Sequence, residues 1–397
     1  MTNGSLPPLS RSRIESIDVL RGVIMILMAL DHTRDFFGNL AENPTNVATT
    51  TIPLFFTRWI THFCAPVFFL LTGAGAFLSL QRRSRSELAR YLVSRGIWLI
   101  VLELVIMRCL GWQWNLDYRV TIITVLWALG WAMIALAALL RLPVAAVTTI
   151  GITMIVGHNL LDGVTAASLG PFGPLWNVLH APGMLLATPR FQVFLGYPLI
   201  PWIGVTMVGY GLGQLYTWTP ERRKTLLLRL GLGLTVAFVV LRLVNVYGDP
   251  LRWTVQTSSM FTLISFLNTN KYPPSLLYLL MTLGPALLAL RALEGKTPSV
   301  LRPALVIGKV PLFYFIMHVP LIHTLALIAC FLRYGEVHWM FESARLDQFP
   351  ITQPEGWPLP LPVIYLIWIS VAVILYFFCR WFAKVKESRR DWWLGYL

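Results

Sequence analysis

Long apolar stretches divide the chain into ten segments, each close to the roughly 20 residues that an α-helix needs to cross a bilayer. The connections between these stretches carry most of the charged residues. We therefore expect an all-α fold, a polytopic membrane helix bundle formed by a single domain over residues 17–384, with a polar tail over 1–16 and a basic tail over 385–397. The predicted segments are 17–37, 53–80, 91–111, 120–140, 144–161, 198–216, 226–246, 275–293, 304–332 and 363–383.

Basic side chains occur in every second connection, and this alternation predicts the orientation of the bundle. Lys and Arg accumulate in cytoplasmic loops, so we expect these connections and both termini to lie in the cytoplasm. The intervening connections are mostly longer and less basic, and one of them contains an apolar stretch, 258–267, that predicts a short interfacial or re-entrant helix. The basic positions are Arg82, Arg83, Arg85, Arg90, Arg141, Arg222, Arg223, Lys224, Arg291, Lys296, Arg302, Lys384, Lys386, Arg389 and Arg390.

The composition supports a membrane protein and excludes several other classes. Of the 397 residues, 56% are hydrophobic and only 13% are charged, whereas soluble domains carry about 25% charged residues. The net charge of +14 follows from the basic cytoplasmic connections, and no nucleic-acid-binding motif accompanies it. The four cysteines form no C-x-x-C pair, so we expect no disulfide framework and no metal site. The expected partner is the lipid bilayer, and a homodimer remains possible.

Ionisable residues gather at the end of the first segment, in the sequence DHTRDFF. Such groups are costly at membrane depth and usually face a protein interior or a wet cavity. His32 can change its charge near neutral pH, and Asp35 lies three residues later on the same helical face, where it can orient the ring. Asp31 is a weaker candidate for this role. One interpretation is a general base at the membrane boundary, and the other is a charge cluster that anchors the end of the helix.

The second segment returns from the outer side with Arg58 and His62, which lie four residues apart on one helical face. The functional interpretation is that Arg58, His62 and His32 converge on one outer cavity. The alternative is an interfacial belt of Arg and aromatic residues with one core histidine.

Further polar residues are predicted at the same outer boundary. Asn159 and Asp162 end the fifth segment in the sequence GHNLLDG, which is equally typical of a turn. Asn268 and Lys271 precede a Pro-Pro pair at the start of the eighth segment. Free N–H groups at a helix start, together with a cation, suit a carboxylate, a phosphate or a developing oxyanion. A proline-capped interfacial helix start is the alternative.

The ninth segment carries two histidines within KVPLFYFIMHVPLIH. Lys309 is expected near the cytoplasmic side, His318 near the middle of the membrane and His323 further out. A histidine at the depth of His318 needs a partner, which is either a catalytic group or an interhelical hydrogen bond.

Several blocks together resemble a known family, the bacterial relatives of heparan-α-glucosaminide N-acetyltransferase, within a wider group of transmembrane acyltransferases. The resemblance covers most of the chain, and its first two blocks are the most specific. The blocks are RIESIDVLRGVIMILMALDHTRDFF, FFTRWITHFCAPVFFLLTGAGAFLSL, GHNLLD, YPLIPWIGVTMVGYGLG, FLNTNKYPPSLLYLLMTLGP and GKVPLFYFIMHVPLIH.

This resemblance implies an acyltransferase in a bacterial inner membrane. It would move an acetyl or other acyl group from cytoplasmic acyl-coenzyme A, such as acetyl-CoA, to an outer acceptor, often a sugar or glycan. An intramembrane histidine is the expected catalytic group, placed in the characterised branch between the first two spans. Here the candidates are His32 and His62, with His318 as the main rival.

The remaining candidates follow from that assignment. Acceptor contacts are expected from Asn159, Asp162, Asn268, Lys271 and His323. The phosphates of coenzyme A need cations on the cytoplasmic side, and the candidates are Arg21, Arg82, Arg83 and Lys309.

Two other functions remain open. A proton-coupled secondary transporter of a small polar solute would use His32, His318 and Asp162 as a proton relay, although no strong internal repeat accompanies it. A non-catalytic membrane partner is the third possibility. A cytoplasm-facing cavity that holds coenzyme A would distinguish the enzyme from the transporter, which needs two alternating gates.

Overall fold

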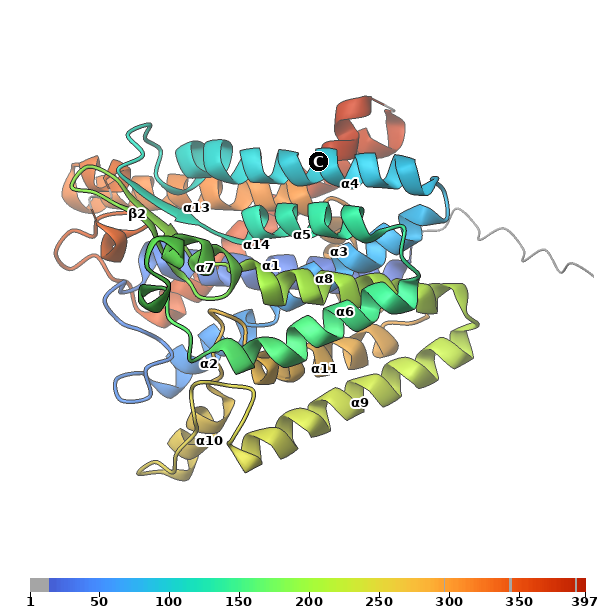
Figure 1. Cartoon of the computed structure of the whole chain (residues 1–397). Coiled ribbons are helices and arrows are strands. Elements are labelled where there is room, and N and C mark those ends of the chain that lie inside the picture. The colour runs from blue at the N-terminus through green and yellow to red at the C-terminus, as the bar shows by residue number, and fades with distance from the viewer. Residues whose placement is uncertain (1–13, 296, 343–344, 390) are drawn as a thin grey trace, which may run out of the picture.

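A computed structural model describes residues 14–295, 297–342, 345–389 and 391–397 of the chain. Most of the predicted tail over 1–16, together with Lys296 and Arg390, lies outside these residues. Helices dominate, and the long ones run side by side as a bundle (Figure 1). They are α1 (Glu15–Phe37), α2 (Ile52–Thr61), α3 (Cys64–Leu80), α4 (Arg85–Val101), α5 (Val125–Leu139), α6 (Val144–Gly157), α7 (Gly173–Leu179), α8 (Leu199–Gly213), α9 (Pro220–Val244), α10 (Ser259–Leu267), α11 (Leu276–Ala292), α12 (Arg302–Lys309), α13 (Pro311–Tyr334) and α14 (Leu361–Ser388).

Within the described residues, five helical stretches are long and apolar enough to cross a membrane, as judged by length and composition. Two shorter apolar helices, α5 and α11, lie where further spans were predicted, and α1, α4 and α8 also occupy predicted segments. The helical bundle is therefore confirmed, whereas the count of ten spans and the cytoplasmic location of the termini stay predictions. The five stretches are Ile52–Leu80, Val144–Leu161, Pro220–Val244, Pro311–Tyr334 and Leu361–Ser388.

The all-α class was wrong in one part, because the chain contains a small three-stranded sheet. Strand β1 (Val120–Ile123) begins the segment that was predicted as a helix over 120–140, and it pairs in parallel with β3 (Gln192–Leu195). Strand β2 (Gly183–Ala187) pairs antiparallel with the other edge of β3. The sequence of β1, VTII, is β-branched and suits a strand. A short apolar run does not reveal by its periodicity whether it is a strand or part of a helix.

Two predicted spans are each broken into two helices. The span 53–80 divides at His62 and Phe63, between α2 and α3. The span 304–332 divides at Val310, whose φ of −134° and ψ of 53° are not helical. A residue before proline disfavours the helical conformation, while Pro311 suits the first turn of the next helix. The break lets α12 and α13 take separate positions against α1.

Helix α1 lies at the centre of the bundle, in contact with α2, α3, α11, α12, α13 and α14. Its packing against α12 depends on two glycines. A Cβ atom added to Gly22 would lie 1.8 Å from the Ala304 carbonyl oxygen, and one added to Gly308 would lie 1.7 Å from the Asp18 carbonyl oxygen. Glycine at both positions therefore permits a close backbone approach, as small residues do between membrane helices.

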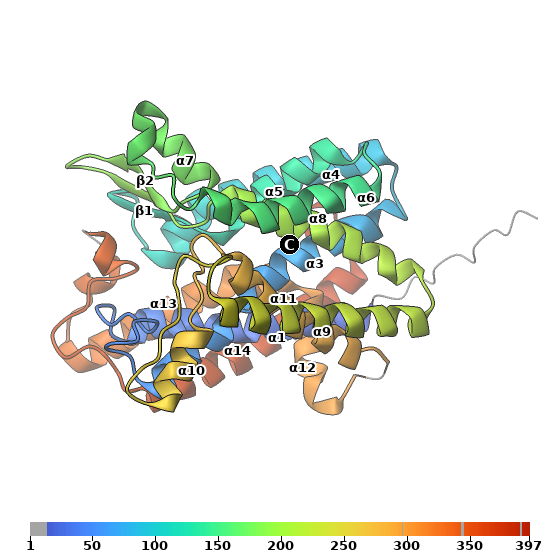
Figure 2. The ribbon, with the colours of Figure 1, turned by 60° about the horizontal axis from the view of Figure 1, so that its bottom comes forward.

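The two ends of the bundle differ. The sheet, α7 and α10 lie at one end, and the starts of α4, α6 and α9 lie at the other (Figures 1 and 2). The basic connections that precede α4, α6 and α9 therefore share one end, as their alternation along the sequence requires. Outer helices present apolar side chains at the surface, such as Val236 of α9 and Phe377 of α14, which suits contact with lipid.

Candidate functional site

The last turns of α1 hold a histidine–carboxylate pair. The Nδ1 atom of His32 lies 3.3 Å from Oδ2 of Asp35, three residues later in the same helix. The His32 side chain is 19% exposed and that of Asp35 is 29% exposed. A carboxylate at Nδ1 holds the proton on that nitrogen and leaves the lone pair on Nε2, which is the arrangement of a general base with its orienting group.

His318 of α13 contacts this pair directly. The ring centroids of His32 and His318 are 5.2 Å apart. His318 is fully buried, and its Nδ1 donates a hydrogen bond of 2.6 Å to the carbonyl oxygen of Phe315. The lone pair of His318 is consequently on Nε2, which has no hydrogen-bond partner. The two histidines that the sequence offered as rivals lie in one site.

Trp112 forms another wall of this site. Its ring meets the His32 ring edge to face, with the centroids 4.8 Å apart, and it stacks on Phe36. Trp112 is the last residue of a π-helix, Leu102–Trp112, that continues α4. π-Helical turns are uncommon in proteins, and many of those that occur lie at functional sites. No motif in the sequence identified Trp112, because its partners are distant in the chain.

Asp31 does not orient His32. It instead accepts hydrogen bonds from Arg34, at 3.0 Å, and from Arg58 of α2. Arg34 also donates to Asp35, at 2.8 Å. A continuous series of ion pairs therefore runs from His32 through Asp35, Arg34 and Asp31 to Arg58. The geometric reason is that helical neighbours one residue apart point in different directions, so Asp31 and His32 do not face each other.

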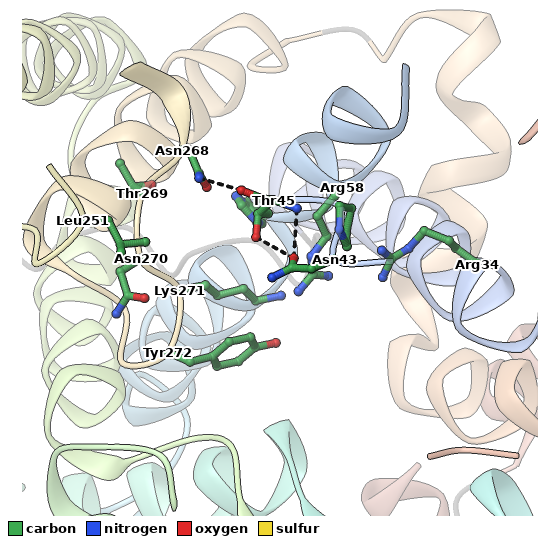
Figure 3. A pocket seen from close by; sticks show the side chains of 12 residues that line it. Arg34, Asn43, Thr45, Arg58, Leu251, Asn268, Thr269, Asn270, Lys271 and Tyr272 are labelled. Carbon is green, nitrogen blue, oxygen red and sulfur yellow. Dashed lines mark hydrogen bonds between the residues drawn. The ribbon is translucent and has the colours of Figure 1, made fainter. Parts of the chain in front are cut away.

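A cavity of about 320 Å³ begins at the far end of this series (Figure 3). Arg34, Arg58 and Lys271 approach it from α1, α2 and the segment before α11, and their ammonium and guanidinium groups give it an excess of positive charge. His62, 2% exposed, is also part of its wall. The lining residues are Arg34, Asn43, Pro44, Thr45, Arg58, His62, Leu251, Asn268, Thr269, Asn270, Lys271 and Tyr272.

The sequence predicted that Arg58, His62 and His32 converge on one outer cavity, and the structure agrees with this in part. Arg58 and His62 line it together, whereas His32 is not among its lining residues and reaches it only through Arg34. Lys271 and Asn268 also line it, and the Asn268 side chain donates to the carbonyl oxygen of Thr45 at 2.8 Å. Fixed cations that converge from separate elements suit an anionic ligand or a developing oxyanion.

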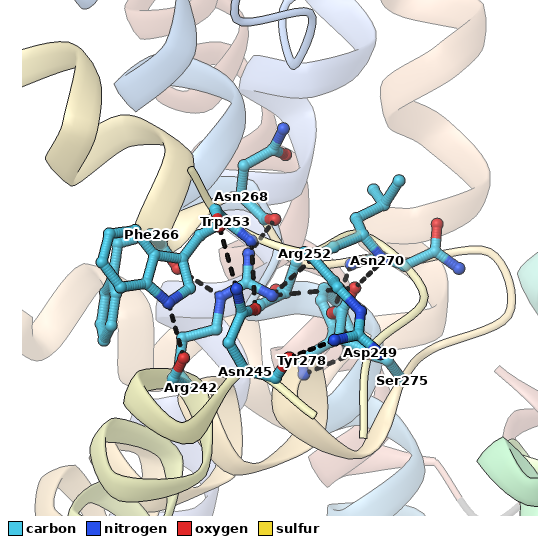
Figure 4. A network of polar contacts seen from close by, with 12 residues as sticks. Arg242, Asn245, Asp249, Arg252, Trp253, Phe266, Asn268, Asn270, Ser275 and Tyr278 are labelled. Carbon is cyan, nitrogen blue, oxygen red and sulfur yellow. Dashed lines mark hydrogen bonds and ion pairs between the residues drawn. The ribbon is translucent and has the colours of Figure 1, made fainter. Parts of the chain in front are cut away.

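The wall segment that contains Asn268 and Lys271 is held in place by Arg242 (Figure 4). Arg242 is 1% exposed near the end of α9. A cation beside the last carbonyls of a helix, here α10, is favourable. Its guanidinium donates to the carbonyl oxygens of Leu251, Ser265, Phe266 and Asn268, at 2.6, 3.1, 2.9 and 2.8 Å respectively.

Asp249 completes the same network. It accepts a hydrogen bond of 2.9 Å from the Asn270 backbone and one of 2.7 Å from the Ser275 hydroxyl. Burial raises the pKa of the Asp249 carboxyl, while the hydrogen bond from Ser275 acts in the opposite direction. Neither Arg242 nor Asp249 was predicted as a site residue from the sequence, because each meets its partners only through tertiary contacts.

The other predicted acceptor residues have structural partners. Asn159 donates to Asp162 at 2.8 Å and accepts from the Leu276 backbone at 2.9 Å, so this pair lies behind the wall segment and does not line the cavity. The ring nitrogens of His323 lie 3.1 Å and 2.7 Å from the carbonyl oxygens of Gly111 and Met340. A backbone carbonyl oxygen therefore lies against each ring nitrogen, so neither nitrogen is open to the acceptor substrate.

The residues predicted to bind the phosphates of coenzyme A, the acyl donor, fall into two groups according to their contacts. Arg21 pairs with Asp18 at 3.0 Å on α1, and Lys309 pairs with Glu387 at 3.1 Å where α12 meets α14. Arg82 and Arg83 are exposed in the connection between α3 and α4, and the Arg83 guanidinium lies 3.9 Å from the centre of the Tyr91 ring.

Comparison with known families decides the classification. The model of the catalytic region of heparan-alpha-glucosaminide N-acetyltransferase matches residues 13–244, which is more than half of the chain. The chain belongs to this family. No curated protein matches it. Membership, together with the apolar helices, makes the chain an integral-membrane acetyltransferase. The family match includes His32, Asp35 and Arg58, and it ends before Lys271 and His318.

Proposed function

We propose that this protein transfers an acetyl group from acetyl-coenzyme A, bound on the cytoplasmic side, to an acceptor on the opposite side of the membrane. The observation that supports it is the His32–Asp35 pair, which contacts His318 and is joined by Arg34 to a cationic cavity. His32 is the general base or the acyl carrier, and Asp35 is its orienting group. The residues proposed for coenzyme A are Arg21, Arg82, Arg83 and Lys309.

In the direct route, the oxygen or nitrogen atom of the acceptor hydroxyl or amine forms a bond to the thioester carbon. His32 removes the proton from that acceptor atom as the bond forms. The carbonyl oxygen becomes an oxyanion, which a nearby cation such as Arg34 stabilises. The C–S bond then breaks, and the sulfur leaves as the thiol with the proton that His32 has held. Asp35 stabilises the imidazolium between these two transfers.

In the alternative route, Nε2 of His32 itself attacks the thioester carbon and the C–S bond breaks, so that an acetyl-histidine forms and coenzyme A leaves as the thiol with the proton from Nδ1. The acceptor hydroxyl or amine then bonds to the acetyl carbon, and its proton passes to the imidazole as the bond between nitrogen and the acetyl carbon breaks. The two routes differ in one observable respect, because only this one releases thiol and labels the protein in the absence of acceptor.

The cationic cavity is the proposed acceptor site. Arg34, Arg58 and Lys271 provide charges that suit a sugar or glycan bearing a carboxylate or phosphate group. Asn268 offers an amide on the same wall. Because Asp31 neutralises part of the charge of Arg34 and Arg58, Lys271 is the cation that we expect to bind the anionic group.

Sealed proteoliposomes test the proposal. With acetyl-coenzyme A labelled in its acetyl group on one side and a panel of neutral and acidic sugars on the other, we expect label on the sugar and an equal amount of free thiol. His32→Ala should lower this rate by roughly 10²–10⁴-fold, the usual contribution of a general base. His338→Ala, which alters a half-exposed histidine outside the site, should leave it unchanged. Proton-coupled uptake of a solute without thiol release would instead establish the transporter.

A further inference from the structure

The ammonium group of Lys271 has no carboxylate partner in the cationic cavity. Lys271 lines the cavity and is only 8% exposed. Arg34 and Arg58 both pair with Asp31, and Arg34 also pairs with Asp35. No ion pair in the described part of the chain includes Lys271, so three cations face two carboxylates and one positive charge is uncompensated. A buried charge without a partner is costly, and a ligand with one negative charge would balance it.

A phenol lies beside this ammonium group. Tyr272 follows Lys271 in the chain and lines the same cavity, and the Lys271 Nζ atom lies 5.2 Å from the centre of the Tyr272 ring. Both side chains point toward the side of the cavity that Arg58 and Arg34 approach (Figure 3). Behind it, the Tyr197 ring meets the Tyr272 ring edge to face, with the centroids 5.4 Å apart. An O–H group next to a cation offers an anion a second hydrogen-bond donor.

The electrostatic surroundings of Tyr272 are consistent with this excess of positive charge. Burial raises the pKa of its phenol, but the cations of Lys271 and Arg58 outweigh burial. A hydrogen bond from Tyr197 acts in the same direction as the cations, and the pKa of Tyr272 is lowered below that of an ordinary tyrosine. The charged and titratable groups around Tyr272, including those that share its cavity, are Asp31, Arg34, Arg58, His62, Tyr197, Lys271 and Tyr278.

We infer that Lys271 and Tyr272 together bind the anionic group of the acceptor, with Lys271 as its counterion and the Tyr272 hydroxyl as a hydrogen-bond donor. One uncompensated charge suits a group with a single negative charge, such as the carboxylate of an acidic sugar. The inference rests on the proposed function in taking this anion as part of the acceptor, and it adds Tyr272 as the residue that selects it. Loss of the Tyr272 proton would remove the donor and cancel the positive charge. Anion binding therefore requires the neutral phenol.

The test measures the binding of glucuronate to the full-length protein in detergent, without acetyl-coenzyme A. Glucose, which has the same ring without the carboxylate, is the neutral comparison, and the ionic strength is matched with sodium chloride. We expect glucuronate at neutral pH to raise the unfolding temperature more than glucose does, because a ligand of the folded state stabilises it. Equal effects of the two sugars would overturn the inference. Because no acyl transfer takes place in this measurement, a failure of the proposed reaction would leave its result unchanged.

A substitution that removes one hydroxyl makes the test specific. Tyr272→Phe keeps the ring and should weaken glucuronate binding by roughly 10–100-fold, the usual contribution of a hydrogen bond to a charged group, while glucose binding stays unchanged. Tyr334→Phe is the matched control, because its hydroxyl donates to the Glu355 carbonyl oxygen at 2.9 Å, outside the cavity. This control should bind glucuronate as the wild type does. Binding of glucuronate by Tyr272→Phe as tightly as by the wild type would refute the role of the phenol.

The pH dependence separates this role from a structural one. As the pH rises from neutral, the wild type should lose affinity for glucuronate below about pH 10, where an ordinary tyrosine ionises, because Tyr272 loses its proton. Tyr272→Phe should not show this loss. Tyr197→Phe removes the hydrogen bond that favours the phenolate and should move the loss to higher pH. An unchanged pH dependence in either variant overturns the inference, so Tyr197→Phe still decides if Tyr272→Phe does not fold.

Discussion

His32 of α1 and His318 of α13 lie in contact, with ring centroids 5.2 Å apart, although they are near opposite ends of the chain. Each has Nδ1 engaged, His32 with Asp35 and His318 with the Phe315 carbonyl. Each imidazole therefore has its free lone pair on Nε2. Of the two, His32 is the one with a carboxylate beside it, which would stabilise the imidazolium formed when the ring takes a proton. This difference is the reason that we propose the proton-accepting role for His32, with His318 as its neighbour.

A double-mutant cycle on these two histidines tests that assignment. We expect His32→Ala to reduce kcat by roughly 10²–10⁴-fold while binding of acetyl-coenzyme A is retained. His318→Ala should reduce kcat less, and the double variant should be little worse than His32→Ala, because residues that act as a unit are strongly non-additive. Near-normal turnover in His32→Ala together with inactivity of His318→Ala would transfer the chemistry to α13.

The fold could be predicted from the sequence where one strong pattern decided it. Long apolar runs located α1, α9 and α14 within a few residues, because a segment that crosses a bilayer must satisfy its own backbone groups and therefore forms a helix. Strand β1 was missed since its four residues lie inside an apolar run of helical length. The division at Val310 was not predicted either, although Pro311 was a local signal, because only packing against α1 shows that the helix changes direction there.

The site could be predicted only as far as helical spacing extends. Pairs three or four residues apart were identified, namely His32 with Asp35 and Arg58 with His62, because a helix brings such residues to one face. Trp112 and Arg242 were not, since they meet their partners through tertiary contacts. The family match identifies a membrane acetyltransferase, whereas the roles of individual residues stay predictions.

Coenzyme A should stabilise the protein against thermal unfolding. A ligand present at 100 times its Kd adds about 2.7 kcal/mol to the free energy of unfolding. Arg82→Glu combined with Arg83→Glu places two negative charges beside the proposed phosphate position, so we expect at least tenfold weaker binding. Arg141→Glu, an exposed arginine in another predicted cytoplasmic connection, is the control for net charge. An unchanged thermal shift in the double variant would place the coenzyme elsewhere, and no shift in the wild type at millimolar concentration would favour the transporter.

The contact between α1 and α12 should tolerate no side chain at Gly308. An added Cβ would lie 1.7 Å from the Asp18 carbonyl oxygen, so Gly308→Ala must separate the two helices. We expect a loss of about 1–3 kcal/mol, the usual cost of overpacking, measured as a lower unfolding temperature in detergent. Gly233→Ala is the matched control, because that helical glycine has no atom within 4 Å of the added Cβ and alanine has the higher helix propensity. Equal effects of the two substitutions would contradict the close approach.

The last prediction concerns Arg242, which holds the cavity wall from behind. Its removal leaves four carbonyl oxygens without their donor, and the buried carboxylate of Asp249 without the cation 3.9 Å away. Breaking a buried ion pair on one side costs about 3–5 kcal/mol. The loss should affect the wall segment first, because Arg242 donates directly to the Asn268 carbonyl oxygen in that segment, and Asp249 accepts from Asn270 and Ser275.

We therefore expect Arg242→Leu to weaken acceptor binding by at least tenfold and to accelerate hydrogen exchange in the segment from Asn268 to Ser275. The affinity for acetyl-coenzyme A should stay unchanged, because its proposed residues lie at the other end of the bundle. Arg229→Leu removes an exposed arginine from the same helix and separates the loss of the network from the loss of one charge. If Arg242→Leu exchanges no faster than Arg229→Leu in that segment, Arg242 does not position the cavity wall, and the cations of Arg34, Arg58 and Lys271 are held together by their own contacts alone.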